Sequence, residues 1–232
     1  LIYAMLLSPD KALRARQLKE LAQRTASGVG KATDELWPEV TPVAARARLP
    51  LVNIALPALR QLRPDEAQEF SQALQWLIES DEQIELFEYV LHKIIRRHLA
   101  PQLGKPVSSA VQHHSLKPLR LDCAVVLSAL SYIGSSSAED VEKAFQAGVS
   151  HLDAKAVRLQ LLPRDECGLK QLDASLDRLA LAAPQIKKSV IEACVHVVAA
   201  DGLIQEREAE LLRGIAETLD CPIPPFVEIA ES

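Results

Sequence analysis

The chain carries one acidic turn twice, and the two copies are 120 positions apart (201 minus 81). The first copy begins at Asp81 and continues to Glu88, and the second begins at Asp201 and continues to Glu208. The similarity extends without a gap into the apolar helical patterns on both sides of each turn. A chance match of a few residues would not extend into the flanking helical patterns, so we expect two copies of one helix-turn-helix unit.

The apolar positions around the two turns correspond at the same offset. Pro64 and Pro184 each begin a helix, since proline is tolerated in the first helical turn. The apolar residues that follow recur at helical spacing, as the core face of an amphipathic helix does. The matched pairs are Val52 and Leu172, Leu56 and Leu176, Leu59 and Leu179, Leu77 and Val197, Leu91 and Leu211, Ile95 and Ile215, and Leu99 and Leu219.

Composition supports a helical fold. Hydrophobic residues make up 48% of the chain and aromatic residues only 4%, which is typical of packed amphipathic helices. We predict an all-α fold, a helical bundle of two pseudo-symmetric halves packed as one domain with almost no strand. The first half is 1–101, a polar connector is 102–118, and the second half is 119–232. Prolines between Trp37 and Pro50 are expected to limit helices there to short pieces, and Pro57 is expected to interrupt the next one.

Charge and cysteine content exclude some functions. The formal net charge is -5, so a nucleic-acid partner is disfavoured. The four cysteines lack C-x-x-C spacing, and a reducing cytoplasmic setting fits them best. No apolar stretch is long enough to span a bilayer, so we expect no membrane span in this segment. Because the chain starts at Leu1 within an apolar pattern, we expect it to be a piece of a longer protein.

The second acidic turn has a structural interpretation. Gly202 is suited to the left-handed conformation that ends a helix. Ile204 would then enter the core. Glu206 and Glu208 would stand in the first turn of the next helix, where the helix dipole stabilises carboxylates by roughly 0.3 to 1 kcal/mol each.

The alternative interpretation is a divalent-cation site, because several carboxylates around one turn supply the oxygen ligands that hard cations bind. The calcium loop D-x-[DN]-x-[DN]-G is absent from both copies, and the first copy has Glu82 in place of the glycine. The candidate ligands are Asp201, Glu206 and Glu208 in the second copy, and Asp81, Glu85 and Glu88 in the first.

Other candidate sites are simpler. The pair His113-His114 in the connector is interpreted as solvated, with transition-metal binding as the alternative. Gly214 is expected to permit a close helix crossing. A basic helix face is interpreted as solvated, with anionic lipid or an acidic partner as the alternative; it comprises His92, Lys93, Arg96, Arg97 and His98. Catalytic motifs such as H-E-x-x-H, G-x-S-x-G and the Walker loop are missing, so we expect no catalytic residues in this fragment.

One resemblance concerns the second turn. The segment from Ala199 to Ile204, with Glu208, Leu211 and Ile215, resembles the TerB-like (tellurite-resistance) helical family. That family joins two helices through an Asp-Gly turn. The resemblance implies an all-helical module with acidic turns, for which metal binding and membrane-associated stress roles are expected.

A second resemblance covers most of the chain. It resembles the C-terminal region of bacterial inner-membrane zinc metallopeptidases of the HtpX/CAAX-protease-like class, in the segments 1–7, 14–18, 49–62, 86–88 and 219–225. It implies a noncatalytic TerB-like regulatory or interaction domain, soluble on the cytoplasmic side of the inner membrane, with the zinc site upstream. The expected partners are its own upstream protease domain and a protein partner or substrate. The alternative is an independent divalent-cation-binding helical module.

Overall fold

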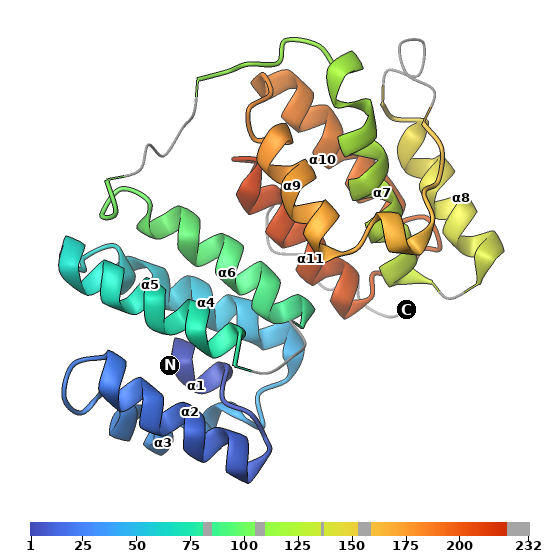
Figure 1. The fold of residues 1–232 in the computed structure, drawn as a ribbon. Helices are drawn as coiled ribbons and strands as arrows, with labels where there is room; N and C mark the ends of the chain where they lie inside the picture. Colours follow the sequence, from blue (N-terminus) through green and yellow to red (C-terminus); the bar gives the residue numbers. More distant parts are fainter. Residues whose placement is uncertain (81–84, 105–109, 136, 153–158, 222–232) are drawn as a thin grey trace. The chain divides into compact units, whose positions relative to one another are not determined.

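The computed structural model describes residues 1–80, 85–104, 110–135, 137–152 and 159–221. Within these ranges the chain forms α-helices, two short 3-10 helices and one isolated β-bridge, with no strand (Figure 1). The predicted all-α fold is confirmed. Contacts divide the chain into two compact units, Leu1–Val107 and Ser108–Ser232. This boundary lies inside the expected connector 102–118, and the packing of both halves as one domain stays a prediction.

The first unit contains six helices. They are α1 (Ile2–Met5), α2 (Lys11–Arg24), α3 (Val29–Val40), α4 (Ala45–Leu59), α5 (Pro64–Ile78) and α6 (Leu86–Leu99). Helix α6 packs against α4 and α5, while α3 packs against α1 and α2. The ring of Tyr3 stacks on Phe70 with centroids 4.9 Å apart, so the short α1 is anchored against α5.

The second unit is arranged around one buried helix. Its elements are the 3-10 helices η1 (Lys117–Leu119) and η2 (Arg164–Glu166), and α7 (Arg120–Gly134), α8 (Ala138–Val149), α9 (Leu169–Leu179), α10 (Pro184–Val198) and α11 (Glu206–Thr218). Helix α7 contacts all four of the other α-helices, and its residues from Asp122 to Ser131 are buried. The remaining helices therefore surround α7, which explains its strongly apolar sequence.

Helix bounds reproduce the sequence repeat. Helices α5 and α10 differ by 120 positions at both ends, and α6 and α11 differ by 120 at their first residue. The matched apolar residues are buried in both units; Leu77 and Val197, for example, are each 1% exposed. The predicted helix pair is confirmed in both copies, and residues 81–84 of the first turn lie outside the described residues.

The expected interruption by prolines is wrong at Pro38, Pro50 and Pro57, whereas Pro42 lies in the break between α3 and α4. Helix α3 continues through Pro38, and α4 continues through Pro50 and Pro57. Each proline removes one backbone hydrogen bond and crowds the preceding turn. In α4 the buried stripe that includes Val52 and Leu56 offsets that cost, since burying one such side chain contributes roughly 1.5 to 3 kcal/mol.

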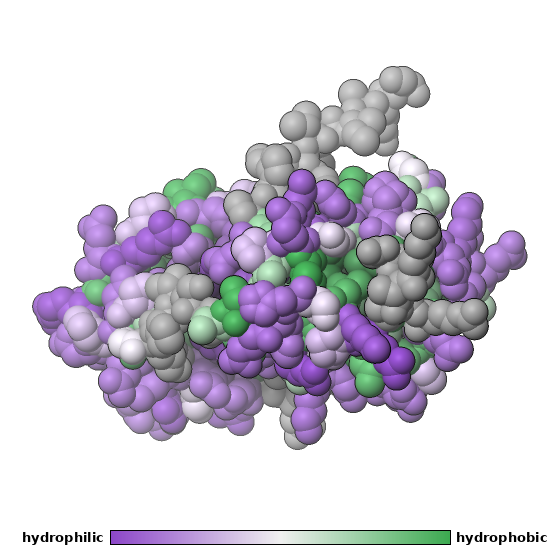
Figure 2. All heavy atoms as spheres, turned by 90° about the horizontal axis from the view of Figure 1, so that it is seen from above, coloured by the Kyte–Doolittle hydropathy of each residue, from purple (hydrophilic) through white to green (hydrophobic). Residues whose placement is uncertain are grey.

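Hydrophilic residues cover most of the described surface seen in Figure 2, and hydrophobic residues are exposed in smaller areas. In the part of the chain that the structure describes, each helix is too short or too polar to cross a membrane. The large apolar side chains exposed to solvent are Leu1, Leu36, Ile54, Val111, Leu121, Leu203 and Ile204.

Candidate functional site

Both acidic turns end in the same helix-capping arrangement. In the first unit the backbone N–H of Glu85 donates to Oε2 of Glu88 at 3.0 Å. In the second, the N–H of Gln205 donates to Oε2 of Glu208 at 2.8 Å. Each is a capping box, in which the third helical residue satisfies the N-cap amide. A buried glutamate at this position therefore helps to begin α6 and α11.

The turn between α10 and α11 closes through Gly202. Its φ is 81°, the left-handed conformation that glycine adopts without a side-chain penalty. Oδ1 of Asp201 accepts a hydrogen bond from the N–H of Leu203 at 2.9 Å. The structure confirms the positive φ of Gly202, but the expectation that Gly202 ends the preceding helix is wrong. Helix α10 already ends at Val198 with Ala199 as its C-cap, so Gly202 turns the chain after the helix.

The expected burial of Ile204 is wrong. Ile204 is 40% exposed and Leu203 is 71% exposed. After the left-handed turn at Gly202 the chain runs without helical structure through residues 203–205. Both side chains therefore lie at the surface of this turn, and the core begins again only in α11.

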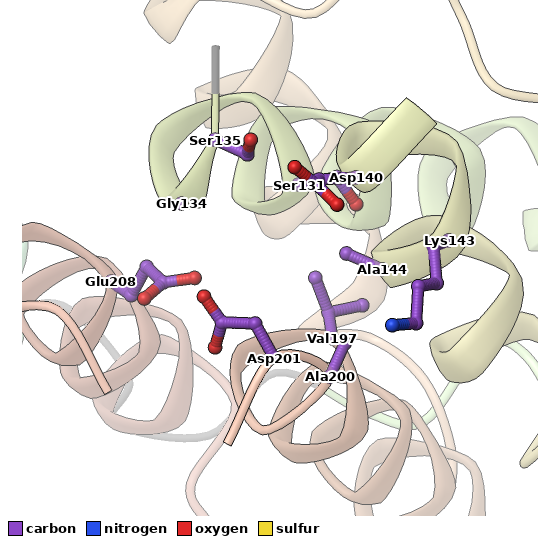
Figure 3. Close-up of a pocket in the computed structure, with 10 residues that line it drawn as sticks. All are labelled: Ser131, Gly134, Ser135, Asp140, Lys143, Ala144, Val197, Ala200, Asp201 and Glu208. Atoms are coloured by element: carbon purple, nitrogen blue, oxygen red, sulfur yellow. The ribbon is translucent and has the colours of Figure 1, made fainter. Parts of the chain in front are cut away.

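A small pocket lies beside this turn, between α7, α8, α10 and α11 (Figure 3). Its volume is about 30 Å³, enough for one or two water molecules or a small ion but not for an organic substrate. The residues that line it are Ser131, Gly134, Ser135, Asp140, Lys143, Ala144, Val197, Ala200, Asp201 and Glu208.

Gly134 makes room for Glu208 on one wall of the pocket. A Cβ atom at Gly134 would overlap the Glu208 carboxylate. The carbonyl oxygen of Gly134 also accepts a hydrogen bond from the side-chain amide of Gln205. The C-terminal end of α7 is thus tied to the N-terminal end of α11 by both residues of the capping box.

Charge within the pocket is unevenly distributed. Glu208 is buried, whereas Asp140, Lys143 and Asp201 are exposed. Burial raises the pKa of Glu208 above its ordinary value, and the negative charge of Asp201 raises it further. Figure 3 shows the carboxylates of Asp201 and Glu208 pointing toward each other. A proton or a cation between these two groups would relieve their repulsion.

The structure brings together part of the predicted second cation set. Asp201 and Glu208 line the pocket, while Glu206 is exposed and does not. In the first copy Glu85 is the N-cap of α6 and Glu88 is buried, and Asp81 lies outside the described residues. Among the residues described, no three His, Cys, Asp or Glu side chains come together as a metal-binding group. Cation binding by these carboxylates stays a prediction.

Sequence reasoning missed Asp140 and Lys143. Both stand in the first half of α8, about sixty residues before the acidic turn, so their proximity to Asp201 comes from tertiary packing. Ser137 is the N-cap of α8, and Asp140 lies in the acidic first turn of this helix.

The other candidate residues are held by backbone hydrogen bonds or are buried. His113 joins the connector to the end of α9: its N–H donates to the carbonyl of Leu181, and its own carbonyl accepts from Ala183 at 2.9 Å. Lys93 is only 4% exposed, so the interpretation of its helix face as fully solvated is wrong at this residue. Cys123 is buried, and burial raises its thiol pKa to about 12, which makes it a poor nucleophile.

Comparison with known proteins identifies part of the second unit. The family described as tellurite resistance protein TerB matches residues 137–229, a segment that includes α8 to α11 and the second acidic turn. No curated protein and no solved structure matches the chain. Residues 137–229 are therefore similar to the TerB family, and the structure is helical wherever it describes regular structure in this segment.

Proposed function

We propose that this chain is a noncatalytic TerB-like regulatory or interaction domain. The observation that carries the proposal is the use of the acidic turns: Glu88 and Glu208 both serve as buried capping acceptors that hold a helix pair together. The pocket next to the second turn is also too small for an organic substrate. A rigid helical module built in this way supports contacts to another protein rather than chemistry of its own.

The proposed parent is a bacterial inner-membrane zinc metallopeptidase, on the strength of the sequence resemblance to the C-terminal region of that class. The domain would lie on the cytoplasmic side of the membrane, and its partners would be the upstream protease domain and a protein substrate. Zinc would belong to that upstream part.

The test of this proposal has two stages. The gene upstream of residue 1 is read for membrane spans and an H-E-x-x-H motif, and lack of either overturns the assignment to a membrane protease. The full-length protein is then compared with a version that ends before residue 1. Zinc content is expected to stay the same while proteolysis of a protein substrate changes. Equal proteolysis by both versions overturns a regulatory role.

A second candidate function is divalent-cation binding, which the facing carboxylates of Asp201 and Glu208 favour. Calcium or magnesium bound there would take these two carboxylates, with water and nearby hydroxyl groups such as that of Ser135 completing the oxygen shell. The repulsion that raises the pKa of Glu208 would then be offset by the cation.

Calorimetric titration with calcium, magnesium and manganese tests this candidate. Binding is expected in the unmodified chain, weakened in Asp201→Asn and retained in the matched control Glu206→Gln, because Glu206 lies outside the pocket. No heat up to roughly millimolar metal, the weak end of calcium affinities in proteins, removes the candidate.

A further inference from the structure

Two histidines stack against each other in the second unit, and neither is among the residues that line the acidic pocket. His151 follows the end of α8, and His196 lies in α10. Their ring centroids are 3.2 Å apart and the ring planes differ by 10°. Both residues are exposed to solvent. A pair of accessible imidazoles in contact is the part of this surface with the clearest capacity to bind a ligand.

The packing of α8 against α10 fixes the positions of both histidines. A Cβ atom at Gly148 would lie 3.0 Å from the carbonyl oxygen of Ala193 and would also overlap Val197, so the two helices approach closely here. His151 follows Gly148 by three positions, and His196 follows Ala193 by three. His196 is thus carried by α10, and His151 lies in the turn directly after α8, close to this helix crossing.

The hydrogen bond of His151 determines which ring nitrogen is available. Nδ1 of His151 lies 3.0 Å from the carbonyl oxygen of Ala147 and 3.1 Å from Oγ of Ser150, whose own hydroxyl donates to the same carbonyl. A carbonyl can only accept, so Nδ1 carries the hydrogen and, in the neutral ring, Nε2 keeps its lone pair. Metal-binding histidines in proteins commonly donate their second nitrogen to a backbone carbonyl in this way. In the described part of the chain, no hydrogen bond occupies Nε2 of either histidine.

We propose that His151 and His196 form a two-imidazole site for a late first-row transition-metal dication, with water completing its coordination. Imidazole nitrogen suits nickel, copper and zinc, whereas calcium and magnesium prefer oxygen. A metal ion bound by both rings must lie near both ring planes, so binding splays the stacked rings by side-chain rotation while the helix crossing stays in place. This site is separate from the cation candidate at Asp201 and Glu208.

Nickel is the probe, and the protein is the full chain without a histidine tag. Calorimetry is expected to show one Ni²⁺ bound per chain with a dissociation constant on the order of 10 µM, and the thermal midpoint is expected to rise when Ni²⁺ is added. Nickel avoids the thiol oxidation that copper would cause at the cysteines.

Four variants test the assignment. His151→Gln and His196→Gln are each expected to weaken Ni²⁺ binding by roughly tenfold or more, and to lose the thermal shift. His114→Gln, an exposed histidine in the connector, and Glu208→Gln, in the acidic pocket, are expected to bind as the unmodified chain does. Thermal midpoints measured in EDTA establish that the variants are folded. If one histidine variant fails to fold, the other still tests the site.

Two results overturn the proposal. One is the absence of Ni²⁺ binding up to about 1 mM, the concentration at which binding free energy falls to roughly 4 kcal/mol. The other is equal Ni²⁺ affinity in the unmodified chain and in a folded variant that lacks either imidazole.

Discussion

The carboxylate of Glu208 lies against Gly134, in the space that a Cβ atom on Gly134 would occupy. Glu208 is 4% exposed and belongs to α11, whereas Gly134 is the last residue of α7. Two helices thus meet at a glycine, and the side chain that fills the space is the capping acceptor of one of them. The contact makes the start of α11 depend on the residue at the end of α7.

Replacing Gly134 with alanine is expected to destabilise the second unit. Alanine favours a helix over glycine by roughly 1 kcal/mol, but the added methyl group displaces the buried Glu208 carboxylate, and overpacking of this kind typically costs about 1 to 3 kcal/mol. We expect a net loss of about 1 kcal/mol in the free energy of unfolding, measured with urea.

A double-mutant cycle isolates this contact. In the background of Glu208→Ala the Gly134→Ala substitution meets no carboxylate, so it is expected to be neutral or stabilising. An equal loss of stability in both backgrounds would show that the methyl group acts on something other than Glu208.

The stability contributed by Glu208 is expected to depend on pH. Its pKa in the folded chain is raised above the ordinary value of 4.5. A carboxyl whose pKa is raised by folding binds its proton more tightly in the native state, so its contribution is complete below about pH 4.5 and is lost as pH rises through the folded pKa. The fold is therefore less stable with Glu208 ionised than with Glu208 protonated.

Glu208→Gln separates this effect from helix capping. Glutamine still offers an oxygen to the N–H of Gln205 and does not ionise. We expect the unfolding free energy of the variant, relative to the unmodified chain, to rise from pH 4.5 toward neutral. Glu208→Ala removes the cap as well and is expected to be about 1 kcal/mol less stable than Glu208→Gln at every pH, since neither side chain ionises. A flat difference between the glutamine variant and the unmodified chain would contradict the raised pKa.

The repeat can be predicted from the sequence because the residues that define it lie close together along the chain, within one helix pair. The Asp-Gly turn, the proline at the first turn of α5 and α10, and the helical spacing around Leu77 and Val197 each act within one helix pair. Such patterns depend on short-range geometry, so they predict helices and their ends well. The all-α fold followed from them.

Only some of the residues that line the acidic pocket can be predicted from the sequence. Asp201 and Glu208 belong to one turn, but Asp140 and Lys143 reach it through the packing of α8 against α10. The stacking of His151 on His196 arises from the same packing. Contacts between residues far apart in a single sequence leave no local pattern, since they depend on how helices cross.

At the prolines, local rules predict a helix break that tertiary packing prevents. Pro38, Pro50 and Pro57 predict short helices by local rules, yet α3 and α4 continue through them. Tertiary burial of residues such as Leu56 outweighs the local cost. Ile204 is apolar and was expected in the core, but the backbone turn at Gly202 leaves it at the surface.

Gly148→Ala is expected to be more damaging than Gly134→Ala. Its Cβ would meet the side chain of Val197 and the backbone oxygen of Ala193, and a backbone atom cannot rotate away. We expect a loss of about 2 to 3 kcal/mol in unfolding free energy. Val197→Ala added to Gly148→Ala relieves only the side-chain overlap and should restore part of the loss at most. Full recovery in the double variant would place the clash at Val197 alone.

Gly202 requires glycine for a different reason from Gly148. Apart from Gly202 itself and its chain neighbours, no described residue has an atom within 4 Å of a Cβ built there, so its constraint is the positive φ of 81°. Gly202→Ala is therefore expected to cost about 1 kcal/mol, the penalty for a left-handed alanine. Gly202→Asn should cost less, because asparagine tolerates this conformation better. Urea unfolding of the two variants measures the difference. If both variants were equally destabilised, contacts of the side chain rather than the backbone angle would have to account for the loss.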